Sequence, residues 1–397
     1  MPNRHRLIAV GLGLALWMGL VSGPTSAMRA TSPPPTAARR AMAGKQVAAP
    51  PAVTVATKAL PDKLSDAEYW ALIEQLSEPG GNFRSDNLVS NEIYMQTIIP
   101  ELQTTTKPGR VYLGVGPEQN FTYITALKPR MVFIIDVRRG NLHTHLMYKA
   151  LFEMSKDRAD FVAKLFSKKR PEGLTTKSTA EEIFGALAGL EKNEALYKEN
   201  LAAIQAHLSK THEFPLSKDD LAGIEYVYYN FYWFGPSLTY SSSSGGGGGR
   251  GGMVNYQALM VATDGAGVSR SYLANEENFQ FMKNLESKNL LVPVVGNFGG
   301  PKAIRNVGQY LRERGAVVSA FYLSNVEQYL SQDGLWYTFC GNFATLPLDD
   351  SSTFIFSQSA QGGNRGGGGG LLSWYRPMLA DVKDNKCDTR GPFSLSR

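Results

Sequence analysis

A short apolar segment, a turn with two glycines and a second apolar segment ending in a carboxylate constrain the fold more than any other feature. Residues 111–114 read Val-Tyr-Leu-Gly, Gly116 follows two positions after Gly114, and residues 131–136 read Met-Val-Phe-Ile-Ile-Asp. Glycine has no Cβ, so the backbone can turn sharply and approach a ligand closely there. Asp136 stands where a second parallel strand would end. The pattern predicts the first βαβ unit of a nucleotide-binding type of α/β fold.

The rest of the chain continues this alternation. Residues 290–295 and 316–323 are apolar strand patterns, residues 276–285 and 301–314 are helix patterns, and residues 352–357 form a late strand pattern. Strands that alternate with helices imply a mostly parallel sheet covered on both faces. The predicted fold class is therefore α/β, Rossmann-like, with a helical insertion after the second strand, at about residues 141–222.

Local patterns predict where individual helices and strands begin and end. Ser65–Glu68 and Thr179–Glu182 read as capping boxes at helix starts, and Ser324–Glu327 reads as a third. A helix is expected at residues 90–102. The aromatic run at residues 223–234 reads as a strand, because aromatic side chains favour extended structure. The segment at 259–263 fits either a helix end or a short strand.

The charge is distributed unevenly. Residues 1–58 contain seven Lys or Arg and no Asp or Glu, so the remaining chain has 34 basic and 35 acidic residues. The body is therefore about neutral, and no basic surface argues for nucleic acid as a partner.

The N-terminus has the pattern of an export signal. Arg4 and Arg6 precede an apolar run at residues 7–21, which is short for a membrane span, and Ala27 ends a stretch of small residues. We expect a signal peptide at 1–27 that places the protein in the periplasm or outside the cell, with no stable membrane anchor beyond that segment. The alternative is an uncleaved segment that leaves the protein cytoplasmic or anchored.

The remaining boundaries follow from composition. Residues 28–60 are rich in Ala and Pro and are expected to form a disordered tether before an α/β domain at 61–380. Two glycine-rich runs, at 241–252 and 362–370, are expected to be surface loops within that domain. A C-terminal tail follows at 381–397. The two cysteines, Cys340 and Cys387, could pair after export, but their spacing does not show that they meet.

The glycine turn is the candidate site. In that context Gly114, Gly116 and Asp136 point to a bound small molecule, whereas the alternative is a tight turn between core elements with Asp136 capping the next helix. Glu118 would repel a pyrophosphate at this turn, which counts against a dinucleotide and favours a ligand with a neutral or cationic end.

These residues carry a family resemblance. The turn from Gly114 to Asn120 and the strand end at Asp136 look like the first two motifs of class I S-adenosylmethionine-dependent methyltransferases. The whole body, with its segments at 293–302 and 324–330, is similar to a little-characterised bacterial family with that Rossmann-like fold.

The resemblance implies a site for S-adenosylmethionine. Gly114 and Gly116 would face the methionine part of the cofactor, Asp136 would accept the ribose hydroxyls, and Glu118 would lie at the same turn. The fourth-strand motif of such enzymes often ends in a carboxylate, and here Asn297 stands there. Asn297 is a candidate for positioning a methyl acceptor, although an amide cannot act as a base.

Other constellations have ordinary explanations. His143 and His145 could form a metal pair on a strand, but a helix is expected there, where residues two apart point to different sides. Arg138 and Arg139 could hold an anion or could be surface residues. The sequence has no nucleophile elbow, P-loop or zinc-type cluster, and no metal is expected.

Two functions remain open at this point. The first is a methyltransferase-like protein that binds a nucleoside-type small molecule at Gly114, Gly116, Glu118 and Asp136. The alternative is an exported, non-catalytic binding or scaffold module that keeps the fold. Protein partners are unspecified by the sequence.

Overall fold

The structure, a computed structural model, describes most of the chain. The described residues are 58–240, 242, 254–359 and 371–383. The expected signal peptide, nearly all of the expected tether, almost all of the two glycine-rich runs and most of the C-terminal tail lie outside these residues. All described residues belong to one compact unit that begins at Thr54.

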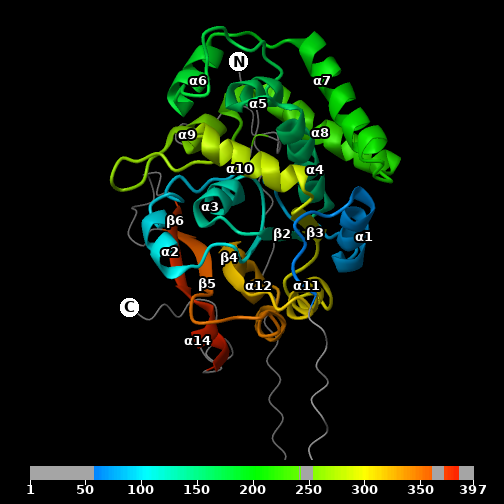
Figure 1. Cartoon of the computed structure of the whole chain (residues 1–397), viewed down its shortest axis with the longest axis vertical. Helices are drawn as coiled ribbons and strands as arrows, with labels where there is room; N and C mark the ends of the chain where they lie inside the picture. Colours follow the sequence, from blue (N-terminus) through cyan, green and yellow to red (C-terminus); the bar gives the residue numbers. More distant parts are fainter. Residues whose placement is uncertain (1–57, 241, 243–253, 360–370, 384–397) are drawn as a thin grey trace, which may run out of the picture. The chain divides into compact units, whose positions relative to one another are not determined.

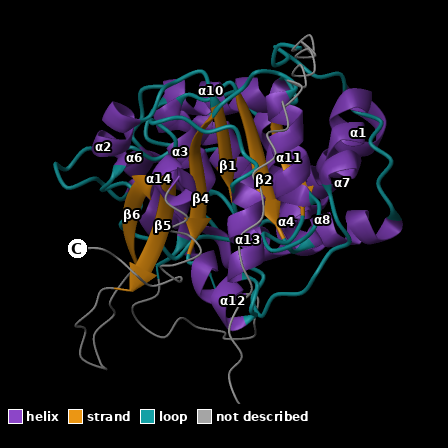
Figure 2. Cartoon of the chain, turned by 90° about the horizontal axis from the view of Figure 1, so that it is seen from below, coloured by secondary structure: helices purple, strands orange, loops and turns teal. Residues whose placement is uncertain are grey.

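A six-stranded sheet forms the centre of this unit (Figures 1 and 2). Its strands lie in the order β3-β2-β1-β4-β5-β6, and every neighbouring pair is parallel except β5 and β6. The predicted α/β, Rossmann-like fold with a mostly parallel sheet is confirmed. The strand bounds are Val111–Gly114 for β1, Met131–Asp136 for β2, Leu291–Val295 for β3, Val318–Ser324 for β4, Thr353–Ser359 for β5 and Leu371–Pro377 for β6.

The central strands are apolar because both of their faces are covered. Every residue of β1, β2 and β3 is buried, as expected for parallel strands between two helical layers. Strand β6, which the sequence reading did not single out, adds an antiparallel edge beside β5.

Helices cover both faces of the sheet (Figure 1). Helices α3, α4 and α10 pack against one another on one face, and α11, α12 and α13 lie on the other, while α1 flanks edge strand β3. Helices α2 and α14 lie toward the opposite edge. The bounds are Asp66–Leu76 for α1, Ile99–Thr105 for α2, Gln119–Leu127 for α3, Arg139–Met154 for α4, Glu276–Ser287 for α10, Ala303–Arg312 for α11, Val326–Gln332 for α12, Trp336–Phe343 for α13 and Met378–Lys383 for α14.

A helical insertion follows β2, as predicted. It begins after the crossover helix α4 and continues past residue 222 to α9, so it is longer than expected. In Figure 1 it forms the green and yellow-green layer above the sheet. Its elements are α5 at Arg158–Leu165, α6 at Ala180–Ala188, α7 at Glu194–Ala206, the π-helix η1 at His207–Thr211, α8 at Lys218–Phe234, the 3-10 turn η2 at Gly235–Ser237 and α9 at Tyr256–Val261.

The strand predicted at residues 223–234 is wrong, because this segment forms most of helix α8. Ile224, Val227, Tyr228 and Phe231 are buried, and their spacing is that of one helix face. Tyr226, Tyr229 and Trp233 lie partly exposed on other sides of the helix. Packing on the helical layer outweighs the strand preference of aromatic residues, which depends strongly on context. The ambiguous segment after residue 258 is also helical, in α9.

The helix predicted at residues 90–102 is largely wrong. Helix α2 begins only at Ile99, with Pro100 in its first turn, where a missing N–H is tolerated. Upstream, the Ser90 N–H donates to the Glu118 carboxylate and the Glu92 N–H to the Ser90 hydroxyl. These bonds fix an irregular loop in place of a helix.

The three predicted capping boxes have different outcomes. Those at Ser65 and Thr179 are confirmed, with both reciprocal hydrogen bonds present. The third is wrong: helix α12 has Asn325 as its N-cap, and the Ser324 hydroxyl donates to Glu92 at 2.7 Å instead. Glu327 accepts from Arg376. Ser324 and Glu327 therefore bond to residues distant in the sequence instead of to each other.

Cys340, on α13, is disulfide-bonded, and Cys387, the second cysteine of the sequence, lies outside the described residues. Within the part of the chain that the structure describes, no helix combines the length and apolar character needed to cross a membrane.

Candidate functional site

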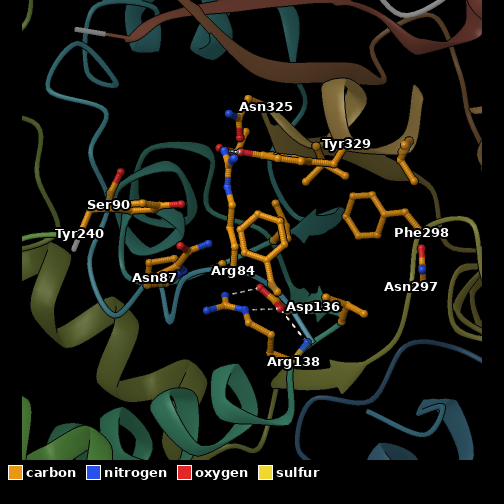
Figure 3. Close-up of a pocket in the computed structure, with 18 of the residues that line it drawn as sticks. Arg84, Asn87, Ser90, Asp136, Arg138, Tyr240, Asn297, Phe298, Asn325 and Tyr329 are labelled. Atoms are coloured by element: carbon orange, nitrogen blue, oxygen red, sulfur yellow. Dashed lines mark hydrogen bonds and ion pairs between the residues drawn. The ribbon is translucent and has the colours of Figure 1, made fainter. Parts of the chain in front are cut away.

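A cavity of about 370 Å³ opens at the carboxyl ends of the central strands (Figure 3). Its walls include Gly116 after β1, Asp136 at the end of β2, Gly296 after β3 and Ser324 at the end of β4. The strand order reverses direction between β1 and β4. Open α/β sheets form their ligand crevices at such a switch point.

One wall of the cavity is a loop that was not predicted from the sequence as part of a site. Residues 77–92 cross the end of the sheet, tied to it by bonds from the Glu78 N–H to the Val295 carbonyl at 2.7 Å and from the Gly81 N–H to the Val137 carbonyl at 2.8 Å. The loop contributes Asn82, Phe83, Arg84, Asn87, Val89, Ser90, Asn91 and Glu92 to the lining. Its composition signals a loop but no chemistry, so no motif could have revealed it.

Asp136 reaches the cavity but is paired with a neighbour. Its Oδ1 accepts from the Arg138 backbone N–H at 2.9 Å and from Nε at 3.0 Å, and its Oδ2 accepts from Nη2 at 2.7 Å. Arg138 Nη1 also donates to the backbone carbonyls of Ser85 and Asp86. Both side chains are almost fully buried. Arg138 therefore neutralises the carboxylate and links it to the loop. The dashed lines in Figure 3 mark the bonds between Arg138 and Asp136.

Gly116 and Gly114 have different roles. Gly116 lines the cavity in a left-handed conformation with φ of 78°, which disfavours a residue with a Cβ. Gly114 is not among the lining residues, and a Cβ there would lie 2.0 Å from Asn120 Oδ1. The Asn120 amide donates to the carbonyls of Val115, Gly116 and Pro117. The absence of a Cβ at Gly114 therefore leaves space for the Asn120 side chain, which hydrogen-bonds the backbone of the turn.

The carbonyl of Gly116 accepts a second hydrogen bond, from a histidine on helix α4. His145 Nε2 donates to it at 3.0 Å, which assigns the proton to Nε2. His145 is buried, and the loss of solvation lowers its pKa to about 4. A neutral imidazole therefore supports the glycine turn.

Glu118 lies inside the protein, outside the cavity lining. It is fully buried, and its Oε1 accepts from the Ser90 N–H at 3.0 Å. Its Oε2 has no hydrogen-bond partner among the described residues. Loss of solvation is the main cause that raises the pKa of Glu118 to about 7, and nearby Glu92 raises it further.

Glu92 is the buried acid that does line the cavity. It accepts hydrogen bonds from Ser324, Tyr322 and Ser357. Burial raises its pKa even though these three bonds oppose the shift. Two buried carboxyl groups with raised pKa values, Glu92 and Glu118, therefore lie behind the glycine turn.

Asn297 lines the cavity at the end of β3. Its Oδ1 accepts from the Gly299 N–H at 2.9 Å, and its backbone carbonyl accepts from the Gly300 N–H at 2.8 Å. Its own N–H donates to Glu78 Oε2 at 3.3 Å. The side-chain oxygen is thus committed to a local turn, and the Nδ2 group is the part of the amide that remains to contact a ligand.

An aromatic and cationic wall completes the site. The rings of Phe83 and Tyr329 meet edge to face at 4.9 Å. Arg84 lies over the Tyr329 ring at 5.0 Å and donates to its hydroxyl at 2.5 Å. Figure 3 shows Arg84 extending toward Asn325 and Tyr329. Because the Arg84 side chain is exposed, its guanidinium has donors available for an anionic group.

The remaining polar candidates do not converge on this cavity. His143 contacts Asp220 Oδ1 at 2.9 Å, and Arg139 Nε donates to the same oxygen at 2.7 Å. Burial lowers the pKa of His143. His143 and His145 lie on helix α4, as predicted, and they contact different partners.

Comparison with known families identifies the chain. Residues 87–220 and 247–363 match a family described as "Domain of unknown function (DUF7790)". The match covers more than half of the chain. The chain belongs to this family. The matched segments include the glycine turn, Asp136, Asn297 and residues 87–92 of the cavity loop, whereas Phe83 and Arg84 precede the match. A search of curated proteins found no match.

Proposed function

We propose that the cavity binds a nucleoside-type small molecule related to S-adenosylmethionine. The observation that carries the proposal is the position of the cavity at the switch point, with Gly116 and Asp136 in its wall. Its volume of about 370 Å³ lies within the usual range for small-molecule sites.

Asp136 retains capacity for a ribose hydroxyl despite its pairing. A carboxylate has about four acceptor positions, and Arg138 occupies two on Oδ1 and one on Oδ2. One position on Oδ2 is left. A ligand would therefore bind to a preformed Asp136–Arg138 pair rather than to a free carboxylate.

The other groups suit the two ends of such a ligand. Phe83 and Tyr329 offer ring faces and edges for stacking a base. Arg84 offers a guanidinium to a carboxylate, such as that of a methionine moiety. The turn at Gly116 allows the ligand to approach the backbone closely. These residues fit the group that the family resemblance implies.

Methyl transfer is the reaction this site would support. S-adenosylmethionine, when bound, would supply an activated methyl group. The chain would contribute proximity and orientation, with the Nδ2 group of Asn297 donating to a methyl acceptor and the loop at 77–92 excluding water from that edge of the cavity.

One observation favours the alternative, an exported binding module without catalysis. The Asn297 oxygen is bound to the Gly299 N–H, and no amide can remove a proton from an acceptor. Cell fractionation separates the two functions: an intact N-terminus in the cytosol favours the enzyme, and a processed chain outside the inner membrane favours the module.

Titration calorimetry of the full chain tests the binding proposal. We expect S-adenosylmethionine and S-adenosylhomocysteine to bind with micromolar affinity. Arg84→Ala should weaken both about tenfold or more, because a hydrogen bond to a charged group contributes about 1.5–3 kcal/mol. Adenosine, which lacks the carboxylate, should bind equally to the parent and to Arg84→Ala.

The matched control is Arg130→Ala. Arg130 is also a partly exposed arginine, but it pairs with Asp62 and does not line the cavity. It should leave all three affinities unchanged. If none of the three compounds binds to folded protein, the nucleoside proposal fails. If they bind equally to the parent, to Arg84→Ala and to Gly116→Val, the ligand lies elsewhere.

A further inference from the structure

Three side chains of the helical layer point their ligand atoms at one place. Glu153 lies near the end of α4, His207 begins η1, and His212 follows its end. Nε2 of His207 and Nε2 of His212 each lie 2.6 Å from Glu153 Oε2. The three ligand atoms all lie within 4.8 Å of one another. The cluster is separate from the cavity at the carboxyl ends of the strands, because the lining of that cavity contains none of these residues.

The π-helix explains why the two histidines meet. In an α-helix, residues five apart point about 140° away from each other. In η1 the His212 N–H donates to the His207 carbonyl at 3.1 Å, which is the i→i+5 pattern of a wider turn. The two rings therefore lie edge to face at 4.9 Å. Isolated π-turns are rare and occur often at functional sites.

A second set of contacts orients the ligands. His212 Nδ1 contacts Asp66 Oδ1 at 2.8 Å, and Asn289 donates to the same oxygen at 2.8 Å. This fixes the His212 ring so that Nε2 faces Glu153. Lys149 donates to the other oxygen of Glu153, Oε1, at 2.8 Å. Carboxylates that hold the second nitrogen of a ligating histidine are typical of metal sites.

The charges around the cluster also suit a cation. Glu153 and Asp66 flank it directly. Lys149 is fully buried beside Glu153, but Glu286 lies close enough to interact electrostatically with both. Glu286 is itself buried, and neither of its carboxylate oxygens has a hydrogen-bond partner within the described residues. Two carboxylates, Glu153 and Asp66, therefore contact the two imidazoles, with Lys149 beside Glu153.

We propose that Glu153, His207 and His212 bind one divalent transition-metal ion through Oε2 and the two Nε2 atoms. Imidazole nitrogens with a carboxylate suit Zn²⁺, Fe²⁺ or Co²⁺, whereas Mg²⁺ and Ca²⁺ prefer oxygen ligands. Around tetrahedral Zn²⁺, with bonds of about 2.0–2.1 Å, ligand atoms lie about 3.3 Å apart. The present separations, from 2.6 Å to at most 4.8 Å, bracket that value, so small side-chain rotations admit the ion.

The ion would join the insertion to the body of the fold. Its ligands come from crossover helix α4 and from η1, and the supporting Asp66 comes from α1. Three protein ligands leave a fourth position for water, as in open zinc sites. The side chains of His207 and His212 are 21% and 12% exposed, so the cluster is not closed off from solvent.

Metal titration of the untagged full chain, stripped with a chelator, tests the proposal. We expect one Zn²⁺ per chain with an affinity at or below micromolar, and visible absorption bands when Co²⁺ replaces it. His207→Ala and His212→Ala should each weaken Zn²⁺ binding about 100-fold or more, because loss of a supporting contact alone costs about 10–100-fold. Asp66→Asn should fall within that smaller range.

His143→Ala is the matched control. His143 is also a mostly buried histidine on a helix in contact with a carboxylate, that of Asp220. It should bind Zn²⁺ as the parent does. Circular dichroism of each variant shows whether it is folded, and Glu153→Gln, which keeps the side-chain shape, is a second ligand variant.

Three results would overturn the proposal. Folded parent protein that takes up no Zn²⁺ or Co²⁺ would overturn the site and leave the cluster as a set of ion pairs. Binding that survives in the His207→Ala/His212→Ala double variant, or that fails in His143→Ala, would place the ion elsewhere on the chain.

Discussion

The cavity at the carboxyl ends of the strands has room for a ligand but its central carboxylate is already paired, whereas the Glu153 cluster has ligand atoms in direct contact with one another. In the cavity, Arg138 makes three hydrogen bonds to Asp136. In the cluster, two imidazole nitrogens approach one carboxylate oxygen. The first arrangement suits a neutral or mixed ligand that adds to an existing ion pair. The second suits a small cation that replaces direct contacts between its ligands.

This difference shows that volume and charge identify different kinds of site. A cavity lined by amides, aromatic rings and a paired carboxylate selects by shape and by a few hydrogen bonds. A cluster of converging donor atoms selects by their geometry and type. The two sites therefore require different substitutions to test them.

The largest effect should come from breaking the ion pair in the cavity wall. Arg138→Met leaves Asp136 buried without its partner, and loss of one member of a buried pair costs about 3–5 kcal/mol. The free energy of unfolding, measured in urea at pH 7, should fall by that amount. The double variant Arg138→Met/Asp136→Leu should be less destabilised than Arg138→Met alone. A loss below about 1 kcal/mol would mean that the ion pair between Asp136 and Arg138 does not form in solution.

The next effect concerns the buried acid behind the glycine turn. Glu118 has a pKa of about 7 in the folded chain against 4.5 as its ordinary value. The folded state therefore binds the proton more tightly, and this contribution is full below pH 4.5 and is lost as the pH rises through 7. Glu118→Gln keeps the acceptor for Ser90 and removes the ionisation.

For this variant we expect stabilisation at pH 8 and little change at pH 4.5. A shift of this size corresponds to at most about 3 kcal/mol. Urea unfolding of parent and variant across that range gives the difference directly. A constant difference at every pH would show that Glu118 ionises normally.

Much of the fold could be predicted because its signals are local. The strands β1 and β2 are apolar runs, and the helix starts at Ser65 and Thr179 contain reciprocal caps that need only four residues. Asp136 could be placed at the ligand-binding end of the sheet, because the carboxyl ends of parallel strands lie together. These features depend on chain neighbours, so a single sequence reveals them.

The rest depends on contacts between distant segments. Nothing in the sequence shows that Ser324 bonds Glu92, 232 positions away, instead of capping a helix. Arg138 and Asp136 are close in the sequence, but their pairing depends on the loop. The backbone carbonyls of Ser85 and Asp86 accept hydrogen bonds from Arg138 Nη1. The meeting of His207 and His212 depends on a π-turn, which has no clear sequence signature.

The two glycines of the turn offer a finer test of the cavity. Gly114→Ala places a Cβ 2.0 Å from Asn120 Oδ1, and such overpacking costs about 1–3 kcal/mol. Gly116→Ala meets only Gln119 at 3.6 Å, but its left-handed backbone adds about 1–2 kcal/mol of strain. Thermal unfolding should show both losses, whereas ligand affinity at equal folded fraction should change for Gly116→Ala alone. Equal loss of affinity in both would show that the whole turn contacts the ligand.

The smallest effect is expected at the cluster when no metal is present. His207 is mostly buried beside Glu153, but Glu153 keeps its contacts with His212 and Lys149 when His207 is removed, so the loss should be about 1 kcal/mol, the net contribution of one hydrogen bond. His207→Ala should therefore unfold in urea with chelator almost as the parent does. With Zn²⁺ at about 100 times its dissociation constant, the parent alone should gain about 2.7 kcal/mol. The gap between the two proteins should widen only when Zn²⁺ is added, because the metal connects α4 to η1 and the imidazole–carboxylate contact by itself adds little. An equal gap with and without Zn²⁺ would mean that His207 acts only through packing and its ion pair.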